Sequence, residues 1–177
     1  MSEYTIQAQN FLDKNGITFN AEFVKNDFHF EGDNDKRDIY KCTFTRKGKS
    51  FSLMFGNSIS KSLKFEDKVS KRVYTPTGKS AGNHSYKYLK PEMFPQNKAQ
   101  EMGCDFKIIQ GEKPTAYDVL ACLTKYDPVD FETFCSNYGY DTDSRKAKKT
   151  FKAVEKEYVQ VVKFFTSEEI EELQEIQ

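Results

Sequence analysis

The sequence predicts an α+β protein with an N-terminal helix, an antiparallel three-stranded meander, a long irregular basic insert and a C-terminal module of four helices. Two observations lead to this fold class. In the first third of the chain, apolar residues alternate with polar ones, which is typical of strands with one buried face. In the last third, apolar residues recur every three or four positions and capping residues separate the runs, which is typical of amphipathic helices.

Residues 1–60 are expected to hold the first helix and the meander. Ala8, Phe11 and Leu12 recur at helical spacing, and Gly16 can end the helix. Three alternating runs follow and predict strands. Their inward residues are Ile17, Phe19, Ala21 and Phe23, then Tyr40, Cys42 and Phe44, and then Phe51, Leu53 and Phe55. The glycine in residues 46–49 predicts a hairpin turn between the last two strands.

Residues 61–113 form a basic inserted segment in which neither period is visible. Glycines and prolines are scattered among lysines and isolated aromatic residues. Such a stretch indicates a long loop or an irregular subdomain. Aromatic residues such as Phe65 and Tyr88 favour packing of at least part of it.

Residues 114–177 are expected to form the helical module. The four helix starts are marked by Thr115 with Asp118, Asp127 with Pro128, Ser144, and Thr166 with Glu169. Gly139 can end the second helix, and the third, about residues 144–165, is the longest. The expected core residues of the module are Leu120, Leu123, Phe134, Phe151, Val154 and Tyr158. A chain of 177 residues is near the size of one domain, so all three segments are expected to form one compact domain.

The net charge of zero conceals a partition along the chain. Residues 61–111 carry 10 Lys and Arg against 5 Asp and Glu, which gives +5, whereas residues 112–177 carry 9 against 14, which gives −5. This distribution favours internal pairing or two contact surfaces of opposite charge.

Neither a cofactor nor a metal site is expected, and the protein is not expected to be an enzyme. His29 and His84 have no Cys or carboxylate pair at metal-ligand spacing. Residues 77–80 resemble the end of a phosphate-binding loop but lack its first glycine, and residues 33–35 resemble the start of a calcium loop that is not completed. The cysteines at 42, 104, 122 and 135 are interpreted as reduced packing residues. With no membrane span or leader pattern, a cytoplasmic protein is expected.

Two groups of basic residues are candidates for binding a partner or a nucleic acid. The first lies on one face of the long helix, opposite the apolar stripe, and contains Arg145, Lys149, Lys152 and Lys156. The second mixes lysines with tyrosines in the insert and contains Lys64, Lys68, Lys71, Arg72, Tyr74, Lys79, Tyr86 and Lys87. Cations with interleaved aromatics suit single-stranded or distorted nucleic acid. The alternatives are a solvated helix surface for the first group and tyrosines that anchor the loop for the second.

Two stretches carry a resemblance to known proteins: GKSFSLMFGNSIS at 48–60 and the segment from PTAYDVL to the end at 114–177. They resemble a family of small proteins of phages, prophages and other bacterial mobile elements, in which a strand hairpin leads almost directly into a PTAYDVL-type helical module. The resemblance covers about half of the chain. Here some fifty residues separate the two stretches, which indicates that the insert carries the specialisation.

The resemblance implies a counter-defence function, since some members of this class are anti-CRISPR proteins. We therefore expect a stoichiometric inhibitor that binds a host defence protein or ribonucleoprotein, with a Cas nuclease complex as the suspected target in the bacterial cytoplasm. The alternative is a nucleic-acid-binding accessory protein of phage replication or transcription that contacts RNA or DNA directly. A membrane partner is not expected.

Overall fold

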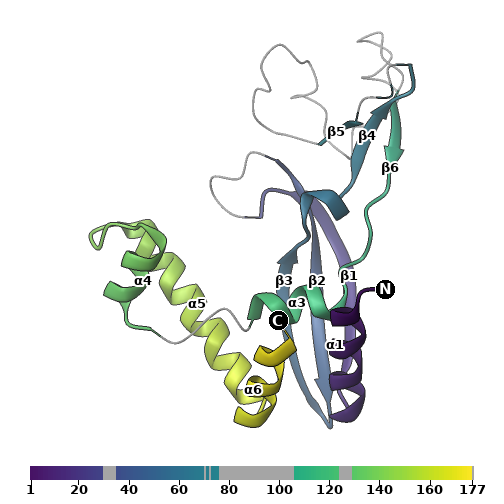
Figure 1. Ribbon diagram of the computed structural model, residues 1–177. Coiled ribbons are helices and arrows are strands. Elements are labelled where there is room, and N and C mark those ends of the chain that lie inside the picture. The colour runs from purple at the N-terminus through teal and green to yellow at the C-terminus, as the bar shows by residue number, and fades with distance from the viewer. Residues whose placement is uncertain (30–34, 70, 72, 76–105, 124–128, 177) are drawn as a thin grey trace. The chain divides into compact units, whose positions relative to one another are not determined.

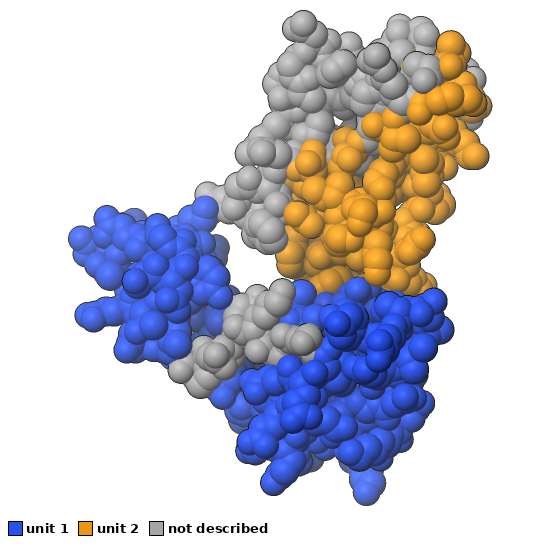
Figure 2. All heavy atoms as spheres, in the orientation of Figure 1, with its two compact units in different colours: residues 1–19, 43–51, 115–177 blue, residues 20–42, 52–114 orange. Residues whose placement is uncertain are grey.

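The computed structural model describes residues 1–29, 35–69, 71, 73–75, 106–123 and 129–176. It confirms an α+β fold with an N-terminal helix, a three-stranded antiparallel sheet and several C-terminal helices (Figure 1). The chain divides into two compact units (Figure 2). Unit 1 comprises residues 1–19, 43–51 and 115–177, and unit 2 comprises residues 20–42 and 52–114. These units do not follow the three segments of the sequence, whose boundaries stay a prediction.

Helix α1 spans Glu3–Lys14 and confirms the predicted N-terminal helix. Its N-cap is Ser2, whose hydroxyl oxygen accepts a hydrogen bond from the backbone N–H of Thr5 at 3.2 Å. This bond satisfies one of the backbone donors that a helix start leaves free. The buried residues of the helix are Ala8, Phe11 and Leu12, as the spacing predicts.

The first sheet has the order β1-β2-β3 and is the predicted meander. Its strands are β1 (Thr18–Asp27), β2 (Arg37–Arg46) and β3 (Lys49–Gly56). Lys47 and Gly48 join β2 to β3 with φ of 39° and 78°. Positive φ at both central residues is the geometry of a type I′ hairpin, whose twist matches that of the strands.

The predicted alternation holds through most of the sheet but fails at Phe23. Cys42 and Phe44 are fully buried, as expected for one face of β2. Phe23 is 51% exposed, although the alternation predicts an inward side chain. Its ring lies at the surface of the edge strand β1 and packs edge-on against Tyr40, with centroids 5.6 Å apart.

The core of unit 1 joins residues from both ends of the chain. The ring of Phe44 stacks on that of Phe51, with centroids 6.3 Å apart, and lies edge-on to the ring of Phe165, with centroids 6.1 Å apart. Phe11 of α1 approaches the same Phe165 at 6.4 Å. We call Phe11, Phe44 and Phe165 the central core; each is at most 2% exposed.

An ion pair ties the β2–β3 hairpin to the C-terminal helix. Arg46 donates from Nη1 to Oε1 of Glu169 at 2.5 Å and from Nη2 to Oε2 at 2.9 Å. The same guanidinium donates to the backbone carbonyl of Phe164 and lies over its ring. Because the two side chains are only 16% and 11% exposed, this pair is shielded from solvent.

The insert contains secondary structure that its sequence does not predict. A 3₁₀ turn at Ile59–Lys61 precedes three short strands, β4 (Lys64–Asp67), β5 (Val73–Tyr74) and β6 (Phe106–Ile109). They form a second antiparallel sheet of order β5-β4-β6 in unit 2. Strands of four and two residues are too short to show a clear period, so only irregular structure was predicted there.

A buried carboxylate holds the base of the insert. Asp38 of β2 is 3% exposed, and its two oxygens accept hydrogen bonds from Asn26 Nδ2 at 2.9 Å and from the Leu63 N–H at 3.0 Å. Its own N–H donates to the hydroxyl of Ser62 at 2.9 Å. Gly111 lies so close that a Cβ there would collide with Oδ2 of Asp38. We call this arrangement the Asp38 clamp.

The first two C-terminal helices are short. Helix α3 spans Ala116–Leu123 and begins with the predicted capping box, in which the Thr115 N–H donates to Asp118 at 2.8 Å and the Asp118 N–H donates to the Thr115 hydroxyl at 3.3 Å. Helix α4 spans Phe131–Tyr138, with Asp130 as N-cap. The predicted start at Asp127 and Pro128 falls outside the described residues. The observed N-cap is Asp130, whose carboxylate accepts a hydrogen bond from the Thr133 N–H at 2.7 Å.

The last two helices begin at the predicted capping residues. Helix α5 spans Arg145–Phe164, and its N-cap Ser144 accepts from the Ala147 N–H at 3.2 Å. Helix α6 spans Ser167–Ile176 and begins with the predicted box, in which the Thr166 N–H donates to Glu169 at 3.1 Å.

The four helices do not share one core. Helix α3 packs against α1, and so does α6, whereas α4 packs against α5. Leu120 and Leu123 therefore belong with α1, apart from the cluster that Phe134 forms with Cys135 and Ala147. Phe151 is a partly buried neighbour of that cluster, so the predicted single core of the module is wrong.

Candidate binding surfaces

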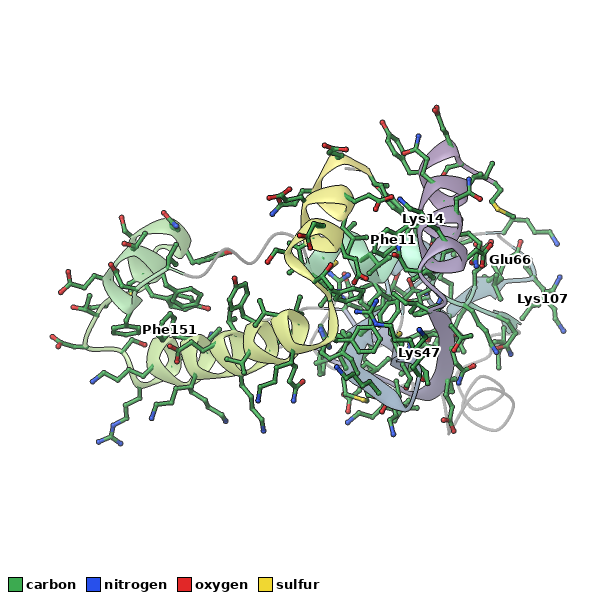
Figure 3. The ribbon with its side chains drawn as sticks, turned by 90° about the horizontal axis from the view of Figure 1, so that it is seen from below. Phe11, Lys14, Lys47, Glu66, Lys107 and Phe151 are labelled. Atoms are coloured by element: carbon green, nitrogen blue, oxygen red, sulfur yellow. The ribbon has the colours of Figure 1, made fainter. Side chains whose placement is uncertain are left out.

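One face of α5 concentrates exposed cations, as predicted. Arg145, Lys149, Lys152 and Lys156 are all exposed, and within the described part of the chain their side chains form no hydrogen bond or ion pair. We call these four residues the cationic face. In Figure 3, nitrogen-ended side chains line the side of α5 that points away from α4 and Phe151. The packing of α4 on the other side holds the helix and leaves this face to solvent.

The N-terminal turn of α5 differs from those of the other described helices. Helices α1, α3, α4 and α6 each carry an acidic residue in the first turn, where a carboxylate stabilises the positive end of the helix dipole. Helix α5 has none there and begins with Arg145 and Lys146. Cations at this end are unfavourable for the helix itself, so helix stability does not explain their placement.

Helix α6 carries the opposite charge. Glu169 is bound to Arg46, and Glu172 lies 3.2 Å from Nζ of Lys14. The remaining three acids are exposed and form no ion pair with another described residue; they are Glu168, Glu171 and Glu175. We call these three residues the acidic face of α6. Sequence reasoning assigned acids at the start of α6 to helix capping, and the repeat of three and four residues was the signal that it missed.

The basic residues of the insert are only partly placed by the structure. Lys64 on β4 is half-buried and donates from Nζ to the backbone carbonyl of Ser60 at 2.8 Å. Lys68 and Lys71 are exposed, and Lys71 has a φ of 63°. Tyr74 forms part of β5, where it is paired with Phe65. The other predicted insert residues, Arg72, Lys79, Tyr86 and Lys87, lie outside the described residues.

The two predicted groups belong to different units. The cationic face is in unit 1, whereas Lys64, Lys68 and Lys71 are in unit 2. Each group is therefore considered by itself.

A groove of about 370 Å³ lies between α1 and α6 within unit 1. Figure 3 shows Phe11 and Lys14 on the side of α1 that faces α6. The residues that line the groove are Gln7, Asn10, Phe11, Lys14, Glu172, Glu175 and Ile176. Its polar groups are mostly amides and the Lys14–Glu172 pair, a mixture that does not define one ligand chemistry.

Two of the described cysteines, Cys42 and Cys135, are poorly suited to nucleophilic chemistry. Burial raises the pKa of the Cys42 thiol to about 12 and also raises the pKa of Cys135. The reactive thiolate is therefore scarce at neutral pH. Among the described residues, no group of three or more His, Cys, Asp or Glu side chains could hold a metal ion.

In comparisons with known proteins, no family model, curated protein or solved structure matches the sequence. Within the described ranges, none of the helices combines the length and apolar character needed to cross a bilayer.

Proposed function

We propose that the protein is a counter-defence protein of a phage or another mobile element, and that it acts by binding a host Cas ribonucleoprotein without catalysing a reaction. The observation that carries this proposal is the cationic face of α5. Four exposed cations whose side chains have no partner among the described residues stand on one side of a single helix, and the first of them, Arg145, lies at the N-terminal end where a cation is unfavourable for that helix.

The dimensions of the cationic face suit a nucleic-acid backbone. At 1.5 Å per residue, Arg145 and Lys156 are about 16 Å apart along the helix axis. A straight row of cations on a rigid helix can follow successive phosphates and release their counterions. Glu155 is the nearest acid in the sequence of this helix, and at about 100° per residue it falls on the flank of the face. The guide RNA or the bound target strand of a Cas complex is such a ligand.

The binding experiment compares the wild-type protein with two charge-reversed variants. Affinity for a panel of purified Cas ribonucleoproteins is measured by biolayer interferometry, together with target cleavage. Lys149→Glu with Lys152→Glu is expected to weaken binding at least about tenfold, since a phosphate that no longer meets a lysine keeps its counterion. Lys41→Glu with Lys49→Glu is the matched control, because both lysines are exposed on the first sheet and the same charge is changed. Equal losses of affinity in both variants, or no binding to any Cas complex, would refute the proposal.

A nucleic-acid-binding accessory protein of phage replication or transcription is the second candidate. The same cationic face favours this candidate, because lysines and arginines can bind the phosphates of free RNA or DNA as well as those of a nucleic acid held in a Cas complex. Fluorescence anisotropy with free RNA and DNA at several salt concentrations separates the two candidates. Binding of free nucleic acid as tight as that of any Cas complex selects the accessory protein.

A further inference from the structure

The cationic face of α5 and the acidic face of α6 have matching spacing. Reading from the N-terminus, Arg145, Lys149 and Lys152 are separated by four and then three residues. Glu168, Glu171 and Glu175 are separated by three and then four. When two helices lie antiparallel, one order is reversed, so each cation meets one carboxylate: Arg145 with Glu175, Lys149 with Glu171, and Lys152 with Glu168.

The antiparallel arrangement is also favoured by the helix dipoles. It places the positive N-terminal end of α5 beside the negative C-terminal end of α6. The charges that complete the contact, Arg145 and Glu175, lie at these same two ends. Side-chain charges and backbone dipoles thus select the same direction.

The pairing cannot form within one molecule. Only Phe165 and Thr166 separate α5 from α6. At 1.5 Å per residue, Lys152 is about 18 Å and Arg145 about 28 Å from the end of α5. Helix α6, with 10 residues, is about 15 Å long and starts at that end, so its glutamates cannot form these pairs with Arg145, Lys149 and Lys152 of the same chain.

We infer that the cationic face binds the acidic face of a second copy of this chain. Charge complementarity selects this occupant, and a net charge of zero removes the general repulsion that a strongly charged protein would have with its own copy. In a two-fold dimer each α5 meets the partner's α6, which doubles the contact. Exposed ion pairs are weak and screened by salt, so the self-association is expected to be weak and to occur only at low salt and high protein concentration. This self-association needs no host partner, but it occupies the same cationic face as the proposed function, so one face cannot serve both contacts at once.

A charge-swap experiment tests the contact with the full-length chain. One variant reverses two cations of α5, Lys149→Glu with Lys152→Glu, and the other reverses two acids of α6, Glu168→Lys with Glu171→Lys. Sedimentation velocity is measured at about 50 mM and about 500 mM salt, over a range of concentrations. The control is Lys41→Glu with Lys49→Glu. Circular dichroism verifies that each variant is folded, and the absorbance ratio at 260 and 280 nm verifies that nucleic acid is absent.

The expected result is self-association of the wild type and the control at low salt, which disappears at high salt. Each swap variant alone is expected to stay monomeric, since its facing helices then carry like charges. An equimolar mixture of the two swap variants is expected to associate, because both contacts regain opposite charges. A monomeric wild type at low salt overturns the inference. So does a mixture that fails to associate, or a cationic face that binds nucleic acid while the protein remains monomeric.

Discussion

The two aromatic clusters of unit 1 differ in how completely they exclude water. In the central core, Phe11, Phe44 and Phe165 are at most 2% exposed and come from an N-terminal helix, a strand and the C-terminal segment. In the α4–α5 cluster, Phe134 is 4% exposed but Phe151 is only partly buried.

This difference indicates that the central core mainly stabilises the fold, whereas the α4–α5 cluster mainly holds the charged helix α5 in place. The central core joins segments that are distant in sequence and buries its rings almost completely, so it is expected to contribute strongly to the stability of unit 1. The α4–α5 cluster contributes less, since it packs α4 against only one side of α5 while the other side of α5 is charged and exposed. Substitutions that remove one ring at a time measure how far the two clusters differ.

The largest expected effect is that of Phe44→Ala. This ring is fully buried and contacts the rings of Phe19, Phe51 and Phe165, so its removal leaves a cavity that the neighbours cannot fill. We expect a loss of about 3–5 kcal/mol in the free energy of unfolding. Denaturant titration followed by circular dichroism measures it. A loss below about 1 kcal/mol would show that this ring is not central.

Glu169→Gln is expected to have the next largest effect, because it leaves the guanidinium of Arg46 without its charge partner. A loss of about 2–4 kcal/mol is expected near neutral pH. Burial alone raises the pKa of Glu169, but the hydrogen bonds from Arg46 and Thr166 and the charge of Arg46 outweigh it, so the pKa lies below its ordinary value.

The lowered pKa fixes the pH dependence of this variant. Because the carboxyl is more acidic in the folded chain, its contribution is present above the unfolded pKa of about 4.3 and is lost as the pH falls through the folded value. Unfolding titrations of wild type and Glu169→Gln should therefore converge on acidification. A difference that stays constant from neutral pH to about pH 2 would contradict the assignment.

Phe151→Ala is expected to be milder than Phe44→Ala. Phe151 contacts Phe131 and Phe134, with ring centroids 5.4 and 5.3 Å apart, but remains partly exposed. We expect a loss of about 1–2 kcal/mol, measured by hydrogen exchange of α4 amides as well as by denaturant titration. Val159→Ala on α5 is the control, since Val159 is 45% exposed. A loss equal to that of Phe44→Ala would remove the distinction between the two clusters.

The smallest expected effect has the opposite sign. Arg145→Glu places a carboxylate at the positive end of α5 and is expected to raise the free energy of unfolding by about 0.3–1 kcal/mol. Lys163→Glu in the last turn should lower it by a similar amount. Thermal melts at low salt test both. If Arg145→Glu destabilised the protein, the cation would have a structural role, and its assignment to binding would weaken.

Local features of this fold are readable from the sequence. The capping boxes at Thr115 and Thr166 and the turn at Gly48 depend on neighbours within three residues, so the residue types predict them directly. The pairing of β4 with β6 joins residues 64–67 to 106–109, and no local pattern records that partnership. Phe23 is a second example: the alternation predicts which face of the sheet its side chain is on, but not whether another element packs over that face and buries it.

The candidate surfaces divide in the same way. The cationic face was predictable because helical geometry alone sets Lys149 and Lys152 opposite the apolar stripe. The acidic face of α6 was not identified, because a glutamate near a helix start has an ordinary explanation, and only the structure shows that Glu169 and Glu172 are used internally while Glu171 is not.

The Asp38 clamp determines where this protein could accept foreign sequence. It fixes Leu63 beside Gly111, and beyond it the β4–β6 pair runs to the partners Asp67 and Phe106. Directly paired residues of antiparallel strands lie about 5 Å apart, so a new loop joined at these two positions starts with its ends already together. The chain-closure entropy of that loop then rises only with the logarithm of its length. The end of this strand pair is therefore a suitable graft site for a reporter peptide or a binding epitope, and position 111 must stay glycine in any such graft.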